Sequence, residues 1–167
     1  DAIKQAIFLH NQQKELVREL YQIKKKNPPG ISGSETLMIL KVLMSLPVAE
    51  GNELLKSVLA EVKNRPSAIK EKHARLLLWG SIIDDVALVD MIESLDANVV
   101  IDDTCVGSRA YFSDVTITPD PLDGLADYYL AELKCPRTLR DPVLKGNKKD
   151  YQADLENRFG YLKHFVE

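Results

Sequence analysis

The sequence predicts an α/β protein in which a helical N-terminal segment precedes part of a parallel β-sheet. Over residues 1–66, apolar side chains recur at steps of three and four residues, which is the spacing of one helical face. From His73 onward, short apolar runs closed by turn residues replace that spacing, as is typical of buried parallel strands. We therefore expect a helical segment over residues 1–66 and a partial α/β domain over residues 73–167 that is incomplete at its C-terminal end.

Helix-breaking and helix-capping residues divide the N-terminal segment into three expected helices. The first covers residues 1–26 and stops at Asn27-Pro28-Pro29-Gly30, because proline cannot continue a helix. Ser32 and Glu35 have the spacing of a capping box and begin a second helix, which ends near Pro47. A third helix carries the apolar residues between positions 54 and 62.

Two apolar runs with a helical stretch between them indicate a strand–helix–strand crossover. Leu76–Trp79 and Val99–Ile101 are the expected strands, and residues 86–95 are the helix, capped by Asp84-Asp85. A crossover of this length joins parallel strands. Because a two-stranded sheet is not independently stable, either residues 115–117 form another strand or the rest of the sheet lies outside this chain.

The remainder of the chain is expected to be mostly helical. Helices are predicted over residues 122–133 and 150–167, joined by a charged, Pro- and Gly-containing loop over residues 137–149. The chain lacks an initiator methionine and stops within an apparent helix, so we interpret it as a fragment of a longer protein.

Composition excludes several classes of function. Lys plus Arg is 22 and Asp plus Glu is 25, so the net charge is 22 − 25 = −3, which argues against binding to nucleic acid or to an anionic membrane. No apolar run reaches the roughly 20 residues of a membrane span. Two cysteines are too few for a disulfide scaffold or a four-cysteine metal site, so a reducing, cytoplasmic compartment is expected.

The segment directly after the second strand is dense in reactive residue types. Ligands of open α/β sheets bind beyond the carboxyl ends of the strands, and this loop lies there. Neighbouring residues that leave a strand point to opposite faces, so one of its two carboxylates can face a cleft. Its glycine allows close approach of a ligand, and its arginine could hold a carboxylate or phosphate. The candidate cleft residues are Asp102, Asp103, Cys105, Gly107, Ser108 and Arg109.

Each candidate also has a purely structural interpretation. Aspartates after a strand often cap turns, a free cysteine often packs as a small apolar residue, and Arg109 could pair with Asp102 or Asp103. A thiol enzyme with Cys105 as nucleophile would need a histidine, and none is close in sequence. Cys135 is expected to be buried, His10 to be a packing residue, and Lys24 to lie at a solvated helix end.

Three stretches resemble the family of 2-hydroxyacyl-CoA dehydratases and benzoyl-CoA reductases. They are RLLLWGSII from Arg75, VDMIESLDANVVIDDTCVGSRAYF from Val89, and DPLDGLADYYLAELKCPR from Asp120. The resemblance implies a Rossmann- or flavodoxin-like sheet, preceded by a helical connector over residues 1–66. It also implies acyl-CoA as the substrate, dehydrated or reduced by one-electron radical chemistry, a related second subunit, and an ATP-dependent activator protein.

The resemblance further implies a 4Fe-4S cluster in the full-length protein. The family's cluster cysteines, as we place them, lie outside these 167 residues. Cys105 and Cys135 match family positions that need not be ligands, and two thiolates would leave half of a cubane's ligands unfilled. We therefore expect no cluster on this chain alone. The alternative to an enzyme subunit is a non-catalytic α/β binding or assembly domain.

Overall fold

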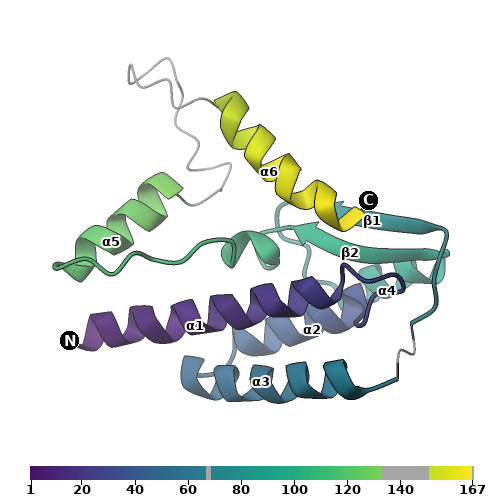
Figure 1. Cartoon of the computed structure of the whole chain (residues 1–167), viewed down its shortest axis with the longest axis horizontal. Helices are drawn as coiled ribbons and strands as arrows, with labels where there is room; N and C mark the ends of the chain where they lie inside the picture. Colours follow the sequence, from purple (N-terminus) through teal and green to yellow (C-terminus); the bar gives the residue numbers. More distant parts are fainter. Residues whose placement is uncertain (67–68, 133–150, 167) are drawn as a thin grey trace.

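The computed structural model describes residues 1–66, 69–132 and 151–166 of the chain. Helices and two strands alternate as the sequence predicts for an α/β protein, and Figure 1 shows their arrangement. In chain order the elements are α1 (Ala2–Ile23), α2 (Gly33–Leu43), α3 (Val48–Asn64), β1 (Ala74–Trp79), α4 (Val86–Ser94), β2 (Ala97–Asp103), η1 (Ser108–Ala110), α5 (Pro121–Asp127), η2 (Tyr128–Glu132) and α6 (Tyr151–Val166).

The three N-terminal helices are confirmed, with two differences at their ends. The capping box is present: Ser32 accepts from the Glu35 amide at 3.0 Å, and the Glu35 carboxylate accepts from the Ser32 amide at 3.0 Å. The third helix begins at Val48, immediately after Pro47. The first ends at Ile23, three residues earlier than expected. Lys24 is 1% exposed, so its interpretation as a solvated residue was wrong. His10, expected to pack in the core, is instead exposed.

The strands β1 and β2 pair in parallel, which confirms the predicted crossover. Leu76 lies opposite Val99 and Leu77 opposite Ile101, so Val100 is an extra residue at a bulge in β2. Within the described residues the sheet has two strands, and residues 115–117 are extended without joining it, so the additional strand considered there was wrong.

β1 is an open edge of this sheet. The Ala74 amide donates to the carbonyl of Asp96 and the Gly80 amide to that of Asp103, both at 3.4 Å. Amides alternate in direction along a strand, so those of Leu77 and Trp79 point away from β2. No described segment pairs with that edge. Every residue of β1 is partly or fully exposed, whereas all of β2 except Asp102 is buried.

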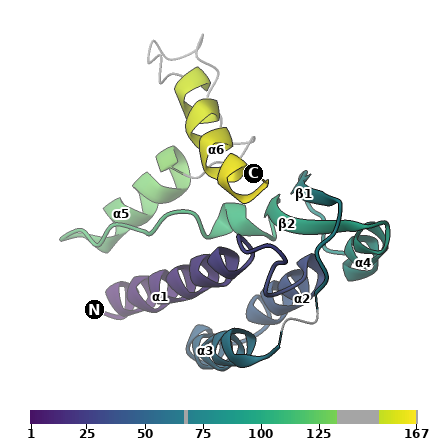
Figure 2. The same cartoon turned by 45° about the vertical axis from the view of Figure 1, so that its right-hand side comes forward.

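Helices cover both faces of the sheet. Figures 1 and 2 show α6 on one side and α2 and α4 on the other, in agreement with the contacts of these helices with the strands. Asp85 caps α4 by accepting from the Ala87 amide at 2.9 Å, as expected. The predicted helix at residues 122–133 is divided into α5 and the π-helical turn η2. Leu133, Cys135 and the expected loop at 137–149 lie outside the described residues.

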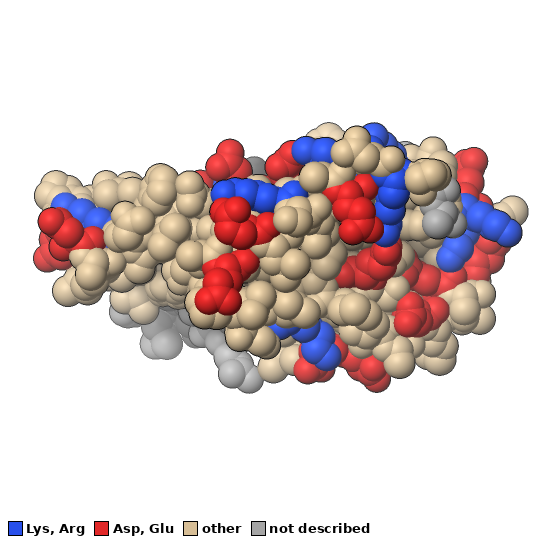
Figure 3. Space-filling model, turned by 90° about the horizontal axis from the view of Figure 1, so that it is seen from below, with Lys and Arg blue, Asp and Glu red and all other residues tan. Residues whose placement is uncertain are grey.

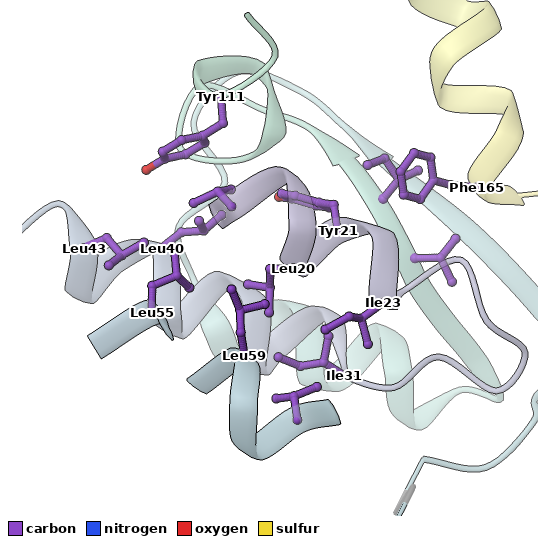
Figure 4. Close-up of a cluster of buried hydrophobic side chains, with 14 of the residues drawn as sticks. Leu20, Tyr21, Ile23, Ile31, Leu40, Leu43, Leu55, Leu59, Tyr111 and Phe165 are labelled. Carbon is purple, nitrogen blue, oxygen red and sulfur yellow. The ribbon is translucent and has the colours of Figure 1, made fainter. Parts of the chain in front are cut away.

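One hydrophobic core joins the N-terminal helices to the sheet. Figure 4 shows side chains from α1, α2 and α3 meeting those of β2, η1 and α6. Burial of this apolar surface is the main stabilising contribution to the fold, at about 25 cal/mol per Å². The members with at most 3% exposure are Val17, Leu20, Tyr21, Ile31, Leu40, Leu43, Leu55, Leu59, Val100, Ile101, Leu162 and Phe165.

A buried carboxylate fixes the helical segment to the sheet. Glu93 in α4 is 7% exposed and accepts from the amides of Gly33 at 2.8 Å, Ser34 at 3.2 Å and Val99 at 3.1 Å. Two of these amides belong to the first turn of α2, where a negative charge is favourable. A Cβ atom on Gly33 would lie 2.7 Å from that of Val99, so the close approach of α2 to β2 requires glycine.

Charges are mixed on the surface of the helical layer. In the face shown in Figure 3, Lys and Arg side chains lie beside Asp and Glu side chains. None of the described helices is long and apolar enough to span a membrane.

Candidate functional site

Asp103 and Arg109 form a buried ion pair at the carboxyl end of β2. The Arg109 Nε donates to Asp103 Oδ1 at 2.9 Å, and the two side chains are 4% and 1% exposed. The terminal nitrogen Nη2 donates to the carbonyls of Gly80 at 3.0 Å and Asp103 at 2.5 Å. Burial opposes the charged guanidinium, but the hydrogen bond and charge of Asp103 outweigh it and raise the pKa of Arg109. The guanidinium therefore ties β1 to the loop after β2.

Asp102 faces the opposite side and meets neutral donors. Its Oδ2 accepts a short hydrogen bond from the Tyr21 hydroxyl of α1. Its Oδ1 accepts from the Ser108 amide at 2.9 Å and from the Thr104 hydroxyl at 3.3 Å. Burial, followed by the charge of Asp102, raises the pKa of Tyr21 well above its ordinary value, so the phenol stays a proton donor. The two adjacent aspartates thus point to opposite faces, as the strand geometry predicts.

Gly107 makes the Asp102 contacts possible. A Cβ atom at this position would lie 1.5 Å from Asp102 Oδ1 and 2.6 Å from the Thr104 hydroxyl oxygen. The neighbouring Ser108 directs its hydroxyl to the Asp102 carbonyl and is 4% exposed. Gly107 and Ser108 therefore shape the loop around the carboxylate, and their side-chain positions are not open to a ligand.

Cys105 is the exposed member of the candidate group. The structure places its thiol at the surface as a free cysteine, 3.4 Å from Nη1 of Arg109. Its amide donates to the Ser81 carbonyl at 2.8 Å, which anchors the loop to the segment after β1. Of the six predicted residues, Asp103, Gly107, Ser108 and Arg109 are buried and Asp102 is half-buried, so Cys105 is the accessible reactive group.

The structure shows which carboxylate pairs with Arg109, a choice between Asp102 and Asp103 that the sequence left open. Arg109 pairs with Asp103, which is the structural interpretation of that residue. A contact between Arg109 and a ligand stays a prediction. The six candidates lie at the end of β2 and in the loop that follows it, and this loop lies at the carboxyl ends of both strands, where Gly80 and Ser81 contact it.

Two residues at the C-terminal end of α1, close to this loop, were not foreseen. Tyr21 bonds to Asp102, and Lys24 is buried within range of the Asp102 charge. Burial lowers the pKa of Lys24 to about 8, against smaller opposing effects of Asp102, Glu93 and Glu35. In the sequence, Tyr21 and Lys24 lie one helical turn apart beside the apolar stripe of α1. Such a position indicates a buried side chain, and it does not indicate a functional one.

The described residues do not fit an iron–sulfur cluster. A cubane cluster takes four thiolate ligands as a rule. The chain has two cysteines, of which the described part contains Cys105. Among the described residues, no three His, Cys, Asp or Glu side chains are grouped so that they could hold a metal ion. Cys135, the other weak candidate, lies outside them.

Comparison with known families places the chain. The family model described as "2-hydroxyglutaryl-CoA dehydratase, D-component" matches residues 1–159. The chain belongs to this family. The match includes the helical segment, the crossover and the loop after β2, so the resemblance carried by the sequence motifs is confirmed.

Two curated relatives are similar to this family member over most of its length. A benzoyl-CoA reductase subunit of Thauera aromatica is 26% identical over 134 residues, covering 79% of this chain and 34% of the relative. "Putative dehydratase subunit YjiM" of Escherichia coli (strain K12) is 32% identical over 166 residues, covering 92% of this chain and 42% of the relative. The chain therefore spans between a third and a half of the length of these relatives.

Proposed function

We propose that this chain is part of a subunit of an enzyme that dehydrates 2-hydroxyacyl-CoA thioesters or reduces benzoyl-CoA-type thioesters. The observation that carries the proposal is the family match over residues 1–159. The relatives' names include one reductase subunit and one dehydratase subunit, so both a lyase and an oxidoreductase are compatible with it. The subunit names also support a partner subunit.

The loop after β2 is the proposed edge of the acyl-CoA cleft. In open α/β sheets, the carboxyl ends of the strands carry the ligand site. Here the Asp103–Arg109 ion pair fixes the loop to β1, and Tyr21 fixes it to α1. Those contacts leave the Cys105 thiol exposed beside the Arg109 guanidinium. In this proposal Cys105 contacts the substrate, and the buried residues position it.

The cofactor and further partners of the whole protein are part of the same proposal. A 4Fe-4S cluster would supply single electrons, delivered by an ATP-dependent activator protein in the cytoplasm. Because the described residues do not fit the cluster, we place its ligands outside them and assign no step through it to these residues. A related second subunit would complete the enzyme.

A non-catalytic assembly domain is the second candidate. It is favoured by the internal use of the polar groups in the loop, since Asp103, Ser108 and Arg109 are all buried and hydrogen-bonded within the chain. A positioning or docking role needs no reactive group at the surface.

Activity of the complete subunit distinguishes the two candidates. The subunit would be purified without oxygen, combined with its partner and activator, and assayed for dehydration of a 2-hydroxyacyl-CoA and for reduction of benzoyl-CoA. Cys105→Ala should lower kcat/KM at least tenfold, whereas Ser57→Ala, at an exposed site on α3, should leave it unchanged. An inactive, iron-free complex after reconstitution would favour the assembly domain.

The isolated chain offers a separate test of the cofactor. Anaerobic reconstitution followed by iron and sulfide analysis should give far fewer than four irons per chain, because the chain has two cysteines. Near four irons per chain, lost on replacing Cys105 and Cys135, would contradict this expectation. Mass determination of the reconstituted species would reveal a cluster shared between two copies.

A further inference from the structure

The layer formed by α2 and α4 presents a groove to solvent. The two helices lie side by side on one face of the sheet (Figure 2) and run antiparallel. The Gly33 amide, at the start of α2, donates to Glu93 near the end of α4 at 2.8 Å. The Lys41 ammonium, near the end of α2, donates to the Asp84 carbonyl just before α4, also at 2.8 Å. The groove between the helices has a volume of about 340 Å³, and its lining residues are Met38, Lys41, Val42, Ser45, Leu46 and Val86.

Apolar side chains are also exposed on α4 itself. Leu88, Met91 and the C-cap residue Leu95 follow one another at steps of three and four residues, so they share one side of the helix. Their exposed fractions are 37%, 56% and 74%, and Met38 on α2 is 55% exposed. A helix at a free surface normally carries polar residues on its outer side. An apolar stripe there instead marks a surface that another protein segment covers.

Opposite charges lie at the two ends of α4. Asp84 and Asp85 come directly before the helix and are exposed. At the other end, the Lys72 ammonium donates to the carbonyl of Ala97 at 3.3 Å and to that of Glu93. These charges complement the helix dipole, which is positive at the N-terminus and negative at the C-terminus. A second α4 helix laid antiparallel on the first would therefore bring Asp84 of one copy beside Lys72 of the other.

We propose that the face formed by α2 and α4 binds the same face of a second copy of this chain, about a two-fold axis that sets the two α4 helices antiparallel. Met91, near the middle of α4, lies beside the same residue of the other copy, and Met38 and Val42 of α2 extend the apolar contact. Methionine suits such a contact, because its flexible thioether side chain adapts to an irregular surface. A two-fold pairing buries the same patch on both chains and closes on itself, so the product is a dimer.

The charges at the helix ends are the reason for choosing a second copy as the occupant. Reversal of α4 places the acidic end of each copy over the basic end of the other, so the two-fold axis supplies the same favourable contact twice. An unrelated partner would have to provide its own complementary ends. The inference rests on this face and not on the proposed reaction, so a failed dehydratase or reductase assay leaves it untouched.

Sedimentation equilibrium of the chain at micromolar concentrations tests the pairing. The expected mass is twice that of one chain. Met91→Glu should raise the dissociation constant of the dimer at least tenfold, because it places two carboxylates together at the axis. Leu122→Glu is the matched control and should leave the mass unchanged. Leu122 is a similarly exposed apolar residue in the first turn of α5, where Glu is compatible with the helix. Melting temperatures would verify that both variants fold.

An exchange of charges tests the antiparallel geometry. Asp84→Lys and Lys72→Glu should each weaken the dimer, because each brings like charges together at both ends of the paired helices. The double variant should recover most of the wild-type affinity, which a purely structural role of either residue would not produce. Leu76→Lys, at the open edge of β1, should leave the dimer intact and so distinguishes this pairing from association through the strand.

Measurements on the complete subunit show whether another occupant covers this face. A dimer of the wild type that Met91→Glu dissociates would support the proposal there as well. If Met91→Glu instead releases the partner subunit, or lowers the melting temperature without changing the mass, the face belongs to that partner or to the rest of the same chain, and the proposal is overturned. A folded wild-type chain that stays monomeric at micromolar concentrations would overturn it too, as would a dimer that is insensitive to Met91→Glu.

Discussion

The two sides of the loop after β2 stabilise neighbouring carboxylates in different ways. On the β1 side, Asp103 is 0% exposed and neutralised by a guanidinium that also bonds to two backbone carbonyls. On the α1 side, Asp102 is half-buried and receives hydrogen bonds from a phenol, a hydroxyl and an amide. The nearby cation on that side is the Lys24 ammonium, whose nitrogen lies 5.5 Å from the centre of the Tyr21 ring.

The difference indicates that the two adjacent carboxylates at the end of β2 hold the following loop in different ways. A buried ion pair needs both partners, and removing one leaves a charge without compensation. A carboxylate held by neutral donors loses one hydrogen bond at a time, at a smaller cost. We therefore interpret the Asp103 side as the fixed attachment of the loop and the Asp102 side as the adjustable one.

The largest expected effect comes from removing the Asp103 charge. Asp103→Asn should lower the free energy of unfolding by about 3–5 kcal/mol, because the Arg109 guanidinium stays buried without its counter-ion. Asp102→Asn is the matched control and should cost about 1–2 kcal/mol, since an amide oxygen can still accept from Tyr21 or Ser108. Urea unfolding at pH 7 measures both. Equal losses would remove the distinction between the two sides.

Replacing Lys24 should stabilise the protein in a pH-dependent way. The pKa of Lys24 is about 8 when folded and 10.5 ordinarily, so the folded state binds fewer protons between those pH values and wild-type stability rises with pH there. Lys24→Met should add on the order of 3 kcal/mol at pH 7, from 1.36 kcal/mol per pKa unit, and the gain should shrink as pH rises.

The measurement for Lys24 is urea unfolding of both proteins from pH 7 to 9.5. This window stays below the ordinary pKa of tyrosine, because the raised pKa values of Tyr21 and Tyr111 make the folded state lose stability above about pH 10. A pH-independent difference between the wild type and Lys24→Met would show that the ammonium is solvated.

Gly107→Ala tests the space around Asp102. A methyl group there would overlap Asp102 Oδ1, so we expect a loss of about 1–3 kcal/mol as the loop shifts. Gly160→Ala in α6 is the control, because a Cβ atom there has nothing within 4 Å and alanine favours a helix by about 0.5–1 kcal/mol. Thermal unfolding should shift in opposite directions for the two variants.

The smallest expected effect is that of the Tyr21 hydroxyl. Tyr21→Phe removes one donor to Asp102 and should cost about 1.5 kcal/mol, as for a hydrogen bond to a charged group. Tyr161→Phe should cost less, and denaturant unfolding compares the two. A loss near that of Asp103→Asn would mean that the Asp102 side is as rigid as the ion pair.

Local sequence signals predicted the secondary structure around this site, whereas tertiary contacts determine which partners its side chains have. The capping box at Ser32, a strand at Val99–Ile101 and the opposite directions of the two aspartates follow from spacing alone, although the strand continues two residues further, to Asp103. The partners do not. Tyr21 is 81 residues from Asp102 in sequence, and the choice of Asp103 over Asp102 by Arg109 depends on the path of the loop after Gly107.

Lys24 illustrates the same limit. Its place at a helix end favours a solvated cation by local rules, because lysine complements the helix dipole there. Tertiary packing overrides the local rule and buries the side chain, and Arg75 of β1 donates both to the Lys24 carbonyl at 3.3 Å and to the Phe165 carbonyl of α6 at 2.7 Å. The early end of α1, at Ile23, likewise reflects the turn that leads to Gly30, whose amide donates to the Ile23 carbonyl at 3.3 Å.

The open edge of β1 has a practical consequence for handling the chain. Unpaired amides along an apolar strand, with Trp79 at 69% exposure, form a template for strand pairing between molecules. Association beyond the proposed dimer should therefore increase with protein concentration and start at this strand. A charged substitution such as Leu76→Lys, at a half-exposed position of β1, should keep concentrated samples monodisperse in light scattering without reaching the loop after β2.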